Sequence, residues 1–139
     1  MVFVDTWAWL ALAYAKDPYQ ASAAAQHREF RRRKTVYVTT DHVLAEFFSA
    51  LFRVVPFDSA RQFADRLFES FEGGRHRRVF LSPEQFQKAY QLRLKYHDKP
   101  GISFVDLTSM VVMQDLAITE VFTGDAHFER VGPGFRVVP

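Results

Sequence analysis

Short apolar segments recur along this chain and alternate with longer segments that have helical periodicity. Five of them are rich in β-branched and aromatic side chains and are expected to form strands: residues 2–4, 36–38, 79–81, 119–123 and 135–138. This alternation predicts an α/β fold with three layers (α/β/α), in which helices cover both faces of a mostly parallel sheet of about five strands. No repeat or linker interrupts the sequence, so we expect one domain over residues 1–139.

The most apolar helical segment lies within residues 103–128. Its apolar side chains cover most of the helix circumference, which predicts an interior helix. Asp106 lies on the same stripe of this helix as Met110. Burying an unpaired carboxylate costs several kcal/mol, so we expect a cation to meet Asp106. Asp125 follows the expected strand at residues 119–123 directly, at the end of the strand where ligands bind in open α/β sheets.

Two further acids map to the same edge of the predicted sheet. Asp5 directly follows the first strand, and Glu46 lies in the first turns of the helix after the second strand. Each has a simpler interpretation. Asp5 is placed to cap the helix that follows, although Thr6 can cap it equally well, and Glu46 taken alone is typical of a solvated helix residue. In a parallel sheet, however, Asp5, Glu46, Asp106 and Asp125 all lie at the carboxyl edge.

Four carboxylates at one edge predict a metal site. Held close together they repel one another and raise each other's pKa unless a cation neutralises them. Carboxylate oxygens, in a chain without Cys, favour Mg²⁺ or Mn²⁺ over Zn²⁺. Such a site can hydrolyse phosphodiester bonds by activating water and stabilising charge on the phosphoryl group.

Composition narrows the possible functions. Without Cys the chain forms no disulfide and no zinc–thiolate site and has no thiol nucleophile, which allows a reducing compartment. The net charge is only +2, but gathering four acids in one site leaves a basic remainder that suits a polyanionic substrate. Basic runs at residues 28–34 and 75–78 have two open interpretations, complementing a helix dipole or contacting nucleic-acid phosphates. No G-x-S-x-G, P-loop or Rossmann glycine pattern is present.

The apolar N-terminal segment does not have the pattern of a signal peptide. No Lys or Arg precedes it, the first being Lys16, and Asp5 interrupts it. No apolar run reaches the length of about 18 residues needed to cross a bilayer. We therefore expect a cytoplasmic protein that is intact from residue 1 and makes no membrane contact.

Three smaller features complete the predictions. Helices near residues 41–52 and 58–70 carry Phe52, Phe57 and Phe63, which indicates either self-association or ordinary packing. His127 follows Asp125 by two residues; a local structural role is favoured over a role as ligand or base. A turn is expected at residues 132–134.

Four fragments carry the acids in a fixed order along nearly the whole chain: residues 2–6 (VFVDT), 38–46 (VTTDHVLAE), 103–106 (SFVD) and 121–128 (VFTGDAHF). In their order and spacing they resemble the PIN-domain ribonucleases, and more narrowly the VapC-type toxins of bacterial and archaeal type II toxin–antitoxin pairs.

This resemblance implies a PIN-like fold and a metal-dependent endoribonuclease that hydrolyses RNA phosphodiester bonds. It further implies that Asp5, Glu46, Asp106 and Asp125 jointly bind Mg²⁺ or Mn²⁺ and carry catalysis. Thr6, Ser103 and Thr123 match the hydroxyl positions that support such a site through hydrogen bonds. The implied partners are RNA, a VapB-type antitoxin that inserts near the active site, and a second copy of the chain in a homodimer.

Other functions remain open at this stage. One is the same nuclease chemistry in RNA processing, without an antitoxin. Another is a catalytically silent module that binds RNA or protein, against which the complete set of acids argues. A phosphorylated receiver domain is disfavoured because Asp5 lacks a neighbouring acid and no matching lysine follows the last strand.

Overall fold

The computed structural model describes residues 1–131 and 134–138, so the turn expected at residues 132–134 lies largely outside the described residues. Five strands form one sheet in the order β3-β2-β1-β4-β5, and all four pairings are parallel. The strands are β1 (Val2–Val4), β2 (Tyr37–Thr40), β3 (Arg77–Val79), β4 (Glu120–Phe122) and β5 (Arg136–Val138). The predicted α/β fold with a largely parallel sheet is confirmed.

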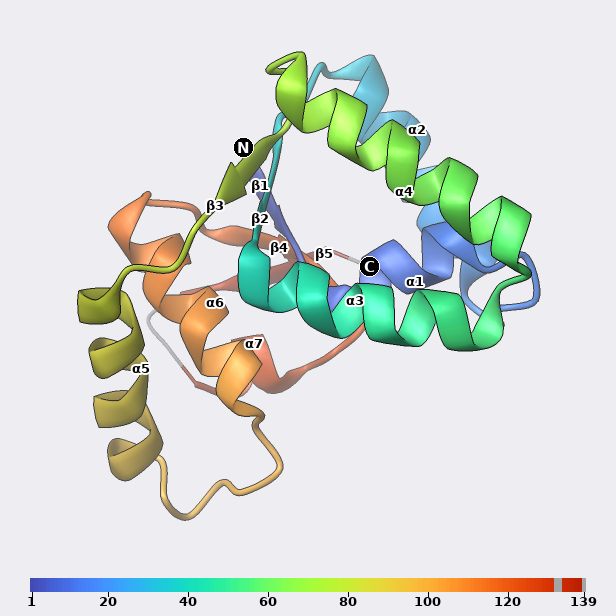
Figure 1. Ribbon diagram of the computed structural model, residues 1–139. Helices are drawn as coiled ribbons and strands as arrows, with labels where there is room; N and C mark the ends of the chain where they lie inside the picture. Colours follow the sequence, from blue (N-terminus) through green and yellow to red (C-terminus); the bar gives the residue numbers. More distant parts are fainter. Residues whose placement is uncertain (132–133, 139) are drawn as a thin grey trace.

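Helices lie on both sides of the strands (Figure 1). They are α1 (Thr6–Ala13), α2 (Gln20–Arg32), α3 (Asp41–Val54), α4 (Phe57–Glu72), α5 (Pro83–Lys95), α6 (Phe104–Asp115) and α7 (His127–Arg130). The group α1 to α4 lies on one side of the sheet, and α5 and α6 pack together on the other (Figure 1). Among the described residues, no helix is both long enough and apolar enough to span a bilayer.

The third strand is displaced from its predicted position at residues 79–81. It begins two residues earlier and pairs with β2 in the register Val38↔Arg77 and Thr40↔Val79. The pairing then stops because the N–H of Leu81 donates to the Asp41 side chain, at 3.0 Å, instead of to a neighbouring strand. As an edge strand, β3 tolerates arginines that a central strand would have to bury.

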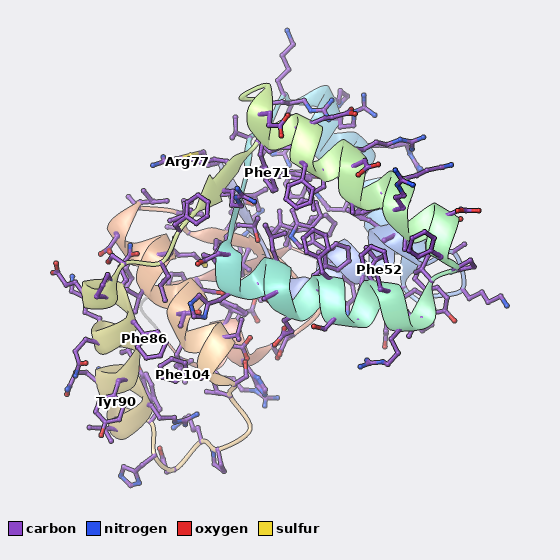
Figure 2. The ribbon with its side chains drawn as sticks, in the orientation of Figure 1. Phe52, Phe71, Arg77, Phe86, Tyr90 and Phe104 are labelled. Atoms are coloured by element: carbon purple, nitrogen blue, oxygen red, sulfur yellow. The ribbon has the colours of Figure 1, made fainter. Side chains whose placement is uncertain are left out.

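Helix α6 is the interior helix that the sequence predicts. Every residue from Asp106 to Met113 is buried. Its first turn is fixed by a capping box between Ser103 and Asp106. On its outer side Phe104 packs against Phe86 of α5, with ring centroids 5.1 Å apart (Figure 2).

The aromatic helices α3 and α4 divide their rings between core and surface. Phe63 packs edge-on against the buried Phe47, at 5.7 Å between centroids. Phe52 and Phe57 lie close to one another but are 46% and 65% exposed. Packing therefore accounts for Phe63, while self-association through the exposed pair stays a prediction.

Candidate active site

Asp5 lies at the carboxyl end of β1 and does not cap the helix that follows. It occupies the N-cap position of α1, yet its side chain makes no cap hydrogen bond. Instead its Oδ2 accepts a hydrogen bond of 3.0 Å from the hydroxyl of Thr123, at the end of β4. The residue is only 4% exposed. Asp5 therefore holds the predicted cap position without a side-chain cap, and its carboxylate faces the neighbouring strand end. The alternative that Thr6 caps the helix is wrong, because Thr6 is the first residue of α1 and its hydroxyl makes no hydrogen bond.

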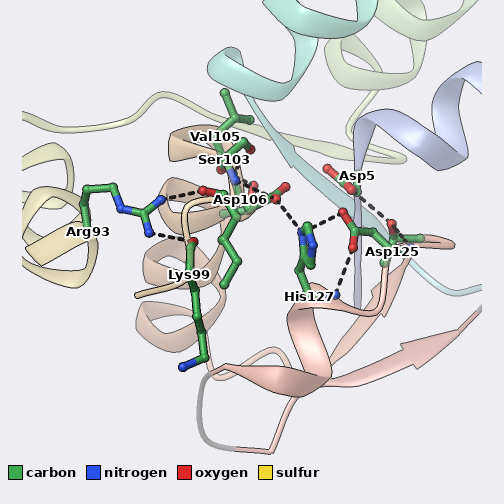
Figure 3. Close-up of polar contacts among 11 residues, drawn as sticks. Asp5, Arg93, Lys99, Ser103, Val105, Asp106, Asp125 and His127 are labelled. Atoms are coloured by element: carbon green, nitrogen blue, oxygen red, sulfur yellow. Dashed lines mark hydrogen bonds and ion pairs between the residues drawn. The ribbon is translucent and has the colours of Figure 1, made fainter. Parts of the chain in front are cut away.

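Asp106 is held rigidly at the start of α6. Its N–H donates to the Ser103 hydroxyl at 3.0 Å, and its Oδ2 accepts the Ser103 N–H at 3.2 Å. The loop before this turn is anchored by Arg93 of α5, whose guanidinium donates to the carbonyl groups of Tyr96, Lys99 and Ile102 (Figure 3). Ser103 thus supports the site through the geometry of the helix start.

Asp125 is held in the loop after β4. Its N–H donates to the Thr123 hydroxyl at 3.1 Å, and its Oδ1 accepts the N–H of His127 at 2.9 Å. Since the same hydroxyl donates to Asp5, Thr123 links two of the predicted site acids through hydrogen bonds.

His127 faces the carboxylates. Its Nδ1 lies 3.2 Å from Asp125 Oδ2 and 3.6 Å from Asp106 Oδ2 (Figure 3). Ligand atoms of these three residues all lie within 4.8 Å of one another. The residue does begin α7, as the favoured structural role required, but it also belongs to the cluster. The two-residue spacing between Asp125 and His127 could have indicated this contact. An Asp side chain often accepts the N–H of the residue two positions later, and such a turn keeps that residue close to the Asp carboxylate.

Glu46 lies at the rim of this group. It is exposed on α3 and lines an open surface depression with Asp41, His42 and Val105, the neighbour of Asp106. Its negative charge still contributes to raising the pKa of Asp5. The structure therefore brings Asp106, Asp125 and His127 together, with Asp5 beside them and Glu46 outside.

The buried acids carry uncompensated charge. The pKa of Asp5 is raised to about 7, first by burial and then by the charges of Asp106 and Glu46. Burial and the charge of Asp125 also raise the pKa of Asp106. In the described part of the chain, no Lys or Arg forms an ion pair with Asp5, Asp106 or Asp125. The cation expected to meet Asp106 is therefore not a Lys or Arg side chain of the described residues. The basic side chain that lies close to Asp106 and Asp125 is His127.

The donor set fits a divalent cation. It offers carboxylate oxygens that Mg²⁺ or Mn²⁺ prefers, and one imidazole nitrogen that Mn²⁺ and later transition metals accept. The hydroxyl of Thr6, next to Asp5, is buried without a hydrogen-bond partner. An unsatisfied buried hydroxyl beside converging carboxylates is the arrangement expected where a further polar species completes a site.

Comparison with known proteins identifies the family. The sequence model of the PIN domain matches residues 2–133. The chain belongs to the PIN-domain family. This assignment confirms the resemblance found in the sequence and the PIN-like architecture expected from it.

Two similar proteins are VapC20 toxins of Mycobacterium tuberculosis, from strains CDC 1551 / Oshkosh and H37Rv. Each is described as a 23S rRNA-specific endonuclease and is 29% identical to this PIN domain over 132 residues, covering 95% of both chains. The crystal structure of VapC20, described as a toxin that cleaves the sarcin–ricin loop, superposes with a TM-score of 0.79 at 28% identity and covers 95% of both chains.

Gly124 places Asp125 by allowing close contact with Trp7. A Cβ at this position would overlap three atoms of the indole ring, among them Nε1 at 2.7 Å. We expect Gly124→Ala to lower the free energy of unfolding by about 1–3 kcal/mol, as overpacking does, and to weaken cleavage because Asp125 is displaced. Urea denaturation measures the first effect and an RNA cleavage assay the second.

Gly101→Ala is the matched control for this substitution. Its Cβ would meet only His127 Nε2, at an ordinary contact distance of 3.9 Å. Equal stabilities of the two variants would show that the Trp7 contact does not constrain the loop.

Proposed function

We propose that this PIN domain is a metal-dependent endoribonuclease that hydrolyses RNA phosphodiester bonds, and that it is the toxin of a toxin–antitoxin pair. The observation that carries the proposal is the convergence of Asp5, Asp106, Asp125 and His127 at the carboxyl edge of the sheet, where no Lys or Arg of the described residues forms an ion pair with the acids. Buried acids with raised pKa values are typical of sites that bind a catalytic cation.

Each residue has a proposed role. Asp106 and Asp125 provide the carboxylates closest to His127 and are proposed as the central metal ligands, with Asp5 next to them. Glu46 lies at the rim, where it is proposed to reach the ion or its bound water from α3. Thr123 and Ser103 orient the acids through the hydrogen bonds described above, and Thr6 offers an unpaired hydroxyl. A bound Mg²⁺ or Mn²⁺ would supply charge stabilisation to the phosphoryl group and an acidified water.

The substrate proposed first is the sarcin–ricin loop of 23S rRNA. The support is the similarity to VapC20 over 95% of both chains. We therefore also propose a cytoplasmic location, since ribosomal RNA would be the substrate.

Two protein partners are also proposed, each by its class. The first is a VapB-type antitoxin, because the solved VapC20 structure, similar over 95% of both chains, is described as that of a toxin. The second is another copy of the chain, since α5 presents a half-exposed apolar row of Phe86, Tyr90 and Leu94, at 46%, 46% and 49% exposure, which a homodimer would cover. Light scattering of the purified chain measures the oligomeric state.

The decisive test is cleavage of an RNA containing the sarcin–ricin loop by the purified full chain. We expect cleavage with Mg²⁺ or Mn²⁺, none in EDTA, and none by the Asp5→Ala variant in any buffer. Cleavage of other structured RNA alone would support an RNA-processing nuclease instead. A folded protein, free of co-purified inhibitor, that cuts no RNA with either metal would refute the nuclease proposal and favour a silent binding module.

A further inference from the structure

Two adjoining cavities lie at the amino end of the sheet, away from the carboxylate cluster. They have volumes of about 290 and 320 Å³, near the lower end of the range for small-molecule sites. Both are lined by His27, Arg75 and His76. The first is also lined by Tyr37, the first residue of β2, which pairs with Val2 at the start of β1. Asp5, in contrast, follows the other end of β1.

One of the two cavities is basic. Besides the three shared residues, its lining consists of Arg31, Lys34 and Thr35, with no acid. Within the basic run that ends α2, Arg32 and Arg33 pair with Glu29. Arg31, Lys34 and Arg75, however, form no ion pair within residues 1–131 and 134–138. The cavity therefore concentrates positive charge that no acid of the described residues neutralises through an ion pair.

The two imidazoles in this cavity are held in fixed positions. His76 stacks on the buried ring of Tyr37, with centroids 4.6 Å apart, and its Nδ1 accepts the Tyr37 N–H at 3.1 Å. Because Nδ1 is an acceptor, neutral His76 carries its proton on Nε2. His27 Nδ1 shares a hydrogen bond of 2.6 Å with the Tyr37 hydroxyl. Burial and the neighbouring arginines lower the pKa of both histidines, as expected where positive charge is crowded.

Lys34 reaches the cavity from an unfavourable backbone conformation. Its φ is 55°, in the left-handed region that a residue with a branched or long side chain rarely adopts. The conformation ends α2 by directing the N–H of Thr35 to the carbonyl of Phe30. Glycine would end the helix at this position without strain. The turn alone therefore does not explain why a lysine stands there.

The other cavity, of about 290 Å³, has an apolar wall that adjoins the basic cavity. Trp9, Leu12 and Phe63 line it, and Gln20 and Arg66 also belong to its lining. A ligand that fills both cavities needs an anionic group for the arginines and a flat or apolar body for the wall. We propose that the pair of cavities binds a phosphate-bearing ligand with an aromatic body, which is the chemistry of a nucleotide. The proposal is independent of RNA cleavage at the carboxylates.

Calorimetric titration of the full chain tests this site. AMP, UMP, inorganic phosphate and adenosine are titrated separately in EDTA, so that metal-bound phosphate at the carboxylates does not contribute. We expect AMP or UMP to bind, and adenosine and inorganic phosphate to bind at least about tenfold more weakly, because each lacks one half of the ligand. Asp106→Asn should leave this binding unchanged.

Substitutions locate the binding. Arg75→Gln and Arg31→Gln should each weaken nucleotide binding about tenfold, through loss of a charge-assisted hydrogen bond. Arg28→Gln is the matched control, since Arg28 is an exposed residue of the same helix α2 that lines neither cavity. Thermal unfolding of each variant confirms that it is folded.

Three outcomes would overturn the proposal. They are no binding of either nucleotide by the wild type, equal weakening by Arg28→Gln, and adenosine or inorganic phosphate binding as tightly as AMP. The last would mean that only one of the two cavities recognises the ligand.

Discussion

The Asp106→Asn variant is expected to lose RNA cleavage by at least about 10³-fold while remaining folded, because it removes a carboxylate from the centre of the proposed metal site. Asparagine keeps an oxygen that can accept the Ser103 N–H, so the capping box survives. The substitution also removes repulsion from Asp125, which contributes to raising the pKa of Asp106. Stability of the metal-free variant should therefore equal or exceed that of the wild type.

Asp115→Asn provides the matched control for this result. Asp115 is the last residue of the same helix, and its carboxylate pairs with Lys88 near the surface. The control makes the same chemical change on the same element, so it should cleave RNA at the wild-type rate. If Asp106→Asn also cleaved at that rate under metal-saturating conditions, the shared-metal interpretation of the site would have to be abandoned.

The location of the site was predictable because parallel strands all end at the same edge of a sheet. Asp5 directly follows β1 and Asp125 lies in the loop after β4; since these strands are neighbours in the sheet, the two acids had to come close together. Asp106 was predictable for a different reason, since a lone acid on an otherwise apolar helix must meet a partner in the interior. Sequence order thus indicated proximity without any knowledge of side-chain positions.

Features that depend on side-chain direction were not predictable in the same way. The exposure of Glu46 agrees with its interpretation as a solvated helix residue, but how near it lies to the other acids depends on which face of α3 meets the core. The position of the His127 ring likewise depends on a local turn, in which the N–H of His127 donates to the side chain of Asp125. The end of β3 depends on Asp41, which is distant from β3 in the sequence and whose side chain accepts the N–H of Leu81.

The basic run at residues 28–34 shows why two interpretations had to stay open. Arg32 and Arg33 pair with Glu29, which precedes them by three and four residues, about one helical turn, and so need no external ligand. Arg31 and Lys34 line a cavity instead. Residues adjacent in sequence project from different faces of a helix, and only the packing of α2 determines which of them meets solvent.

Metal-free stability should depend on pH through Asp5. Its pKa in the folded state is about 7, against an ordinary value of 3.8. Between these values the folded chain holds a proton that the unfolded chain releases. The stabilisation from this protonation is therefore complete below about pH 3.8 and is lost as the pH rises through about 7. Above that pH, the ionised buried carboxylate costs the folded state at most about 4 kcal/mol.

Asp5→Asn should remove this dependence because the amide does not titrate and still accepts the Thr123 hydroxyl. In EDTA, we expect the variant and the wild type to differ little near pH 4. The variant should become progressively more stable than the wild type up to about pH 7, by as much as a few kcal/mol. Urea denaturation across this range measures the difference, with Asp115→Asn as the control for loss of a carboxylate elsewhere.

Adding Mg²⁺ or Mn²⁺ at pH 8 should reverse that order. A cation that binds the folded wild type offsets the cost of its ionised acids, and it stabilises the chain in proportion to the logarithm of its concentration. The Asp5→Asn variant lacks one of the charges that hold the ion and should gain less. Parallel pH curves for the two proteins in EDTA would show that Asp5 does not carry the raised pKa. Equal stabilisation of both proteins by metal would show that Asp5 does not contribute to binding of the ion.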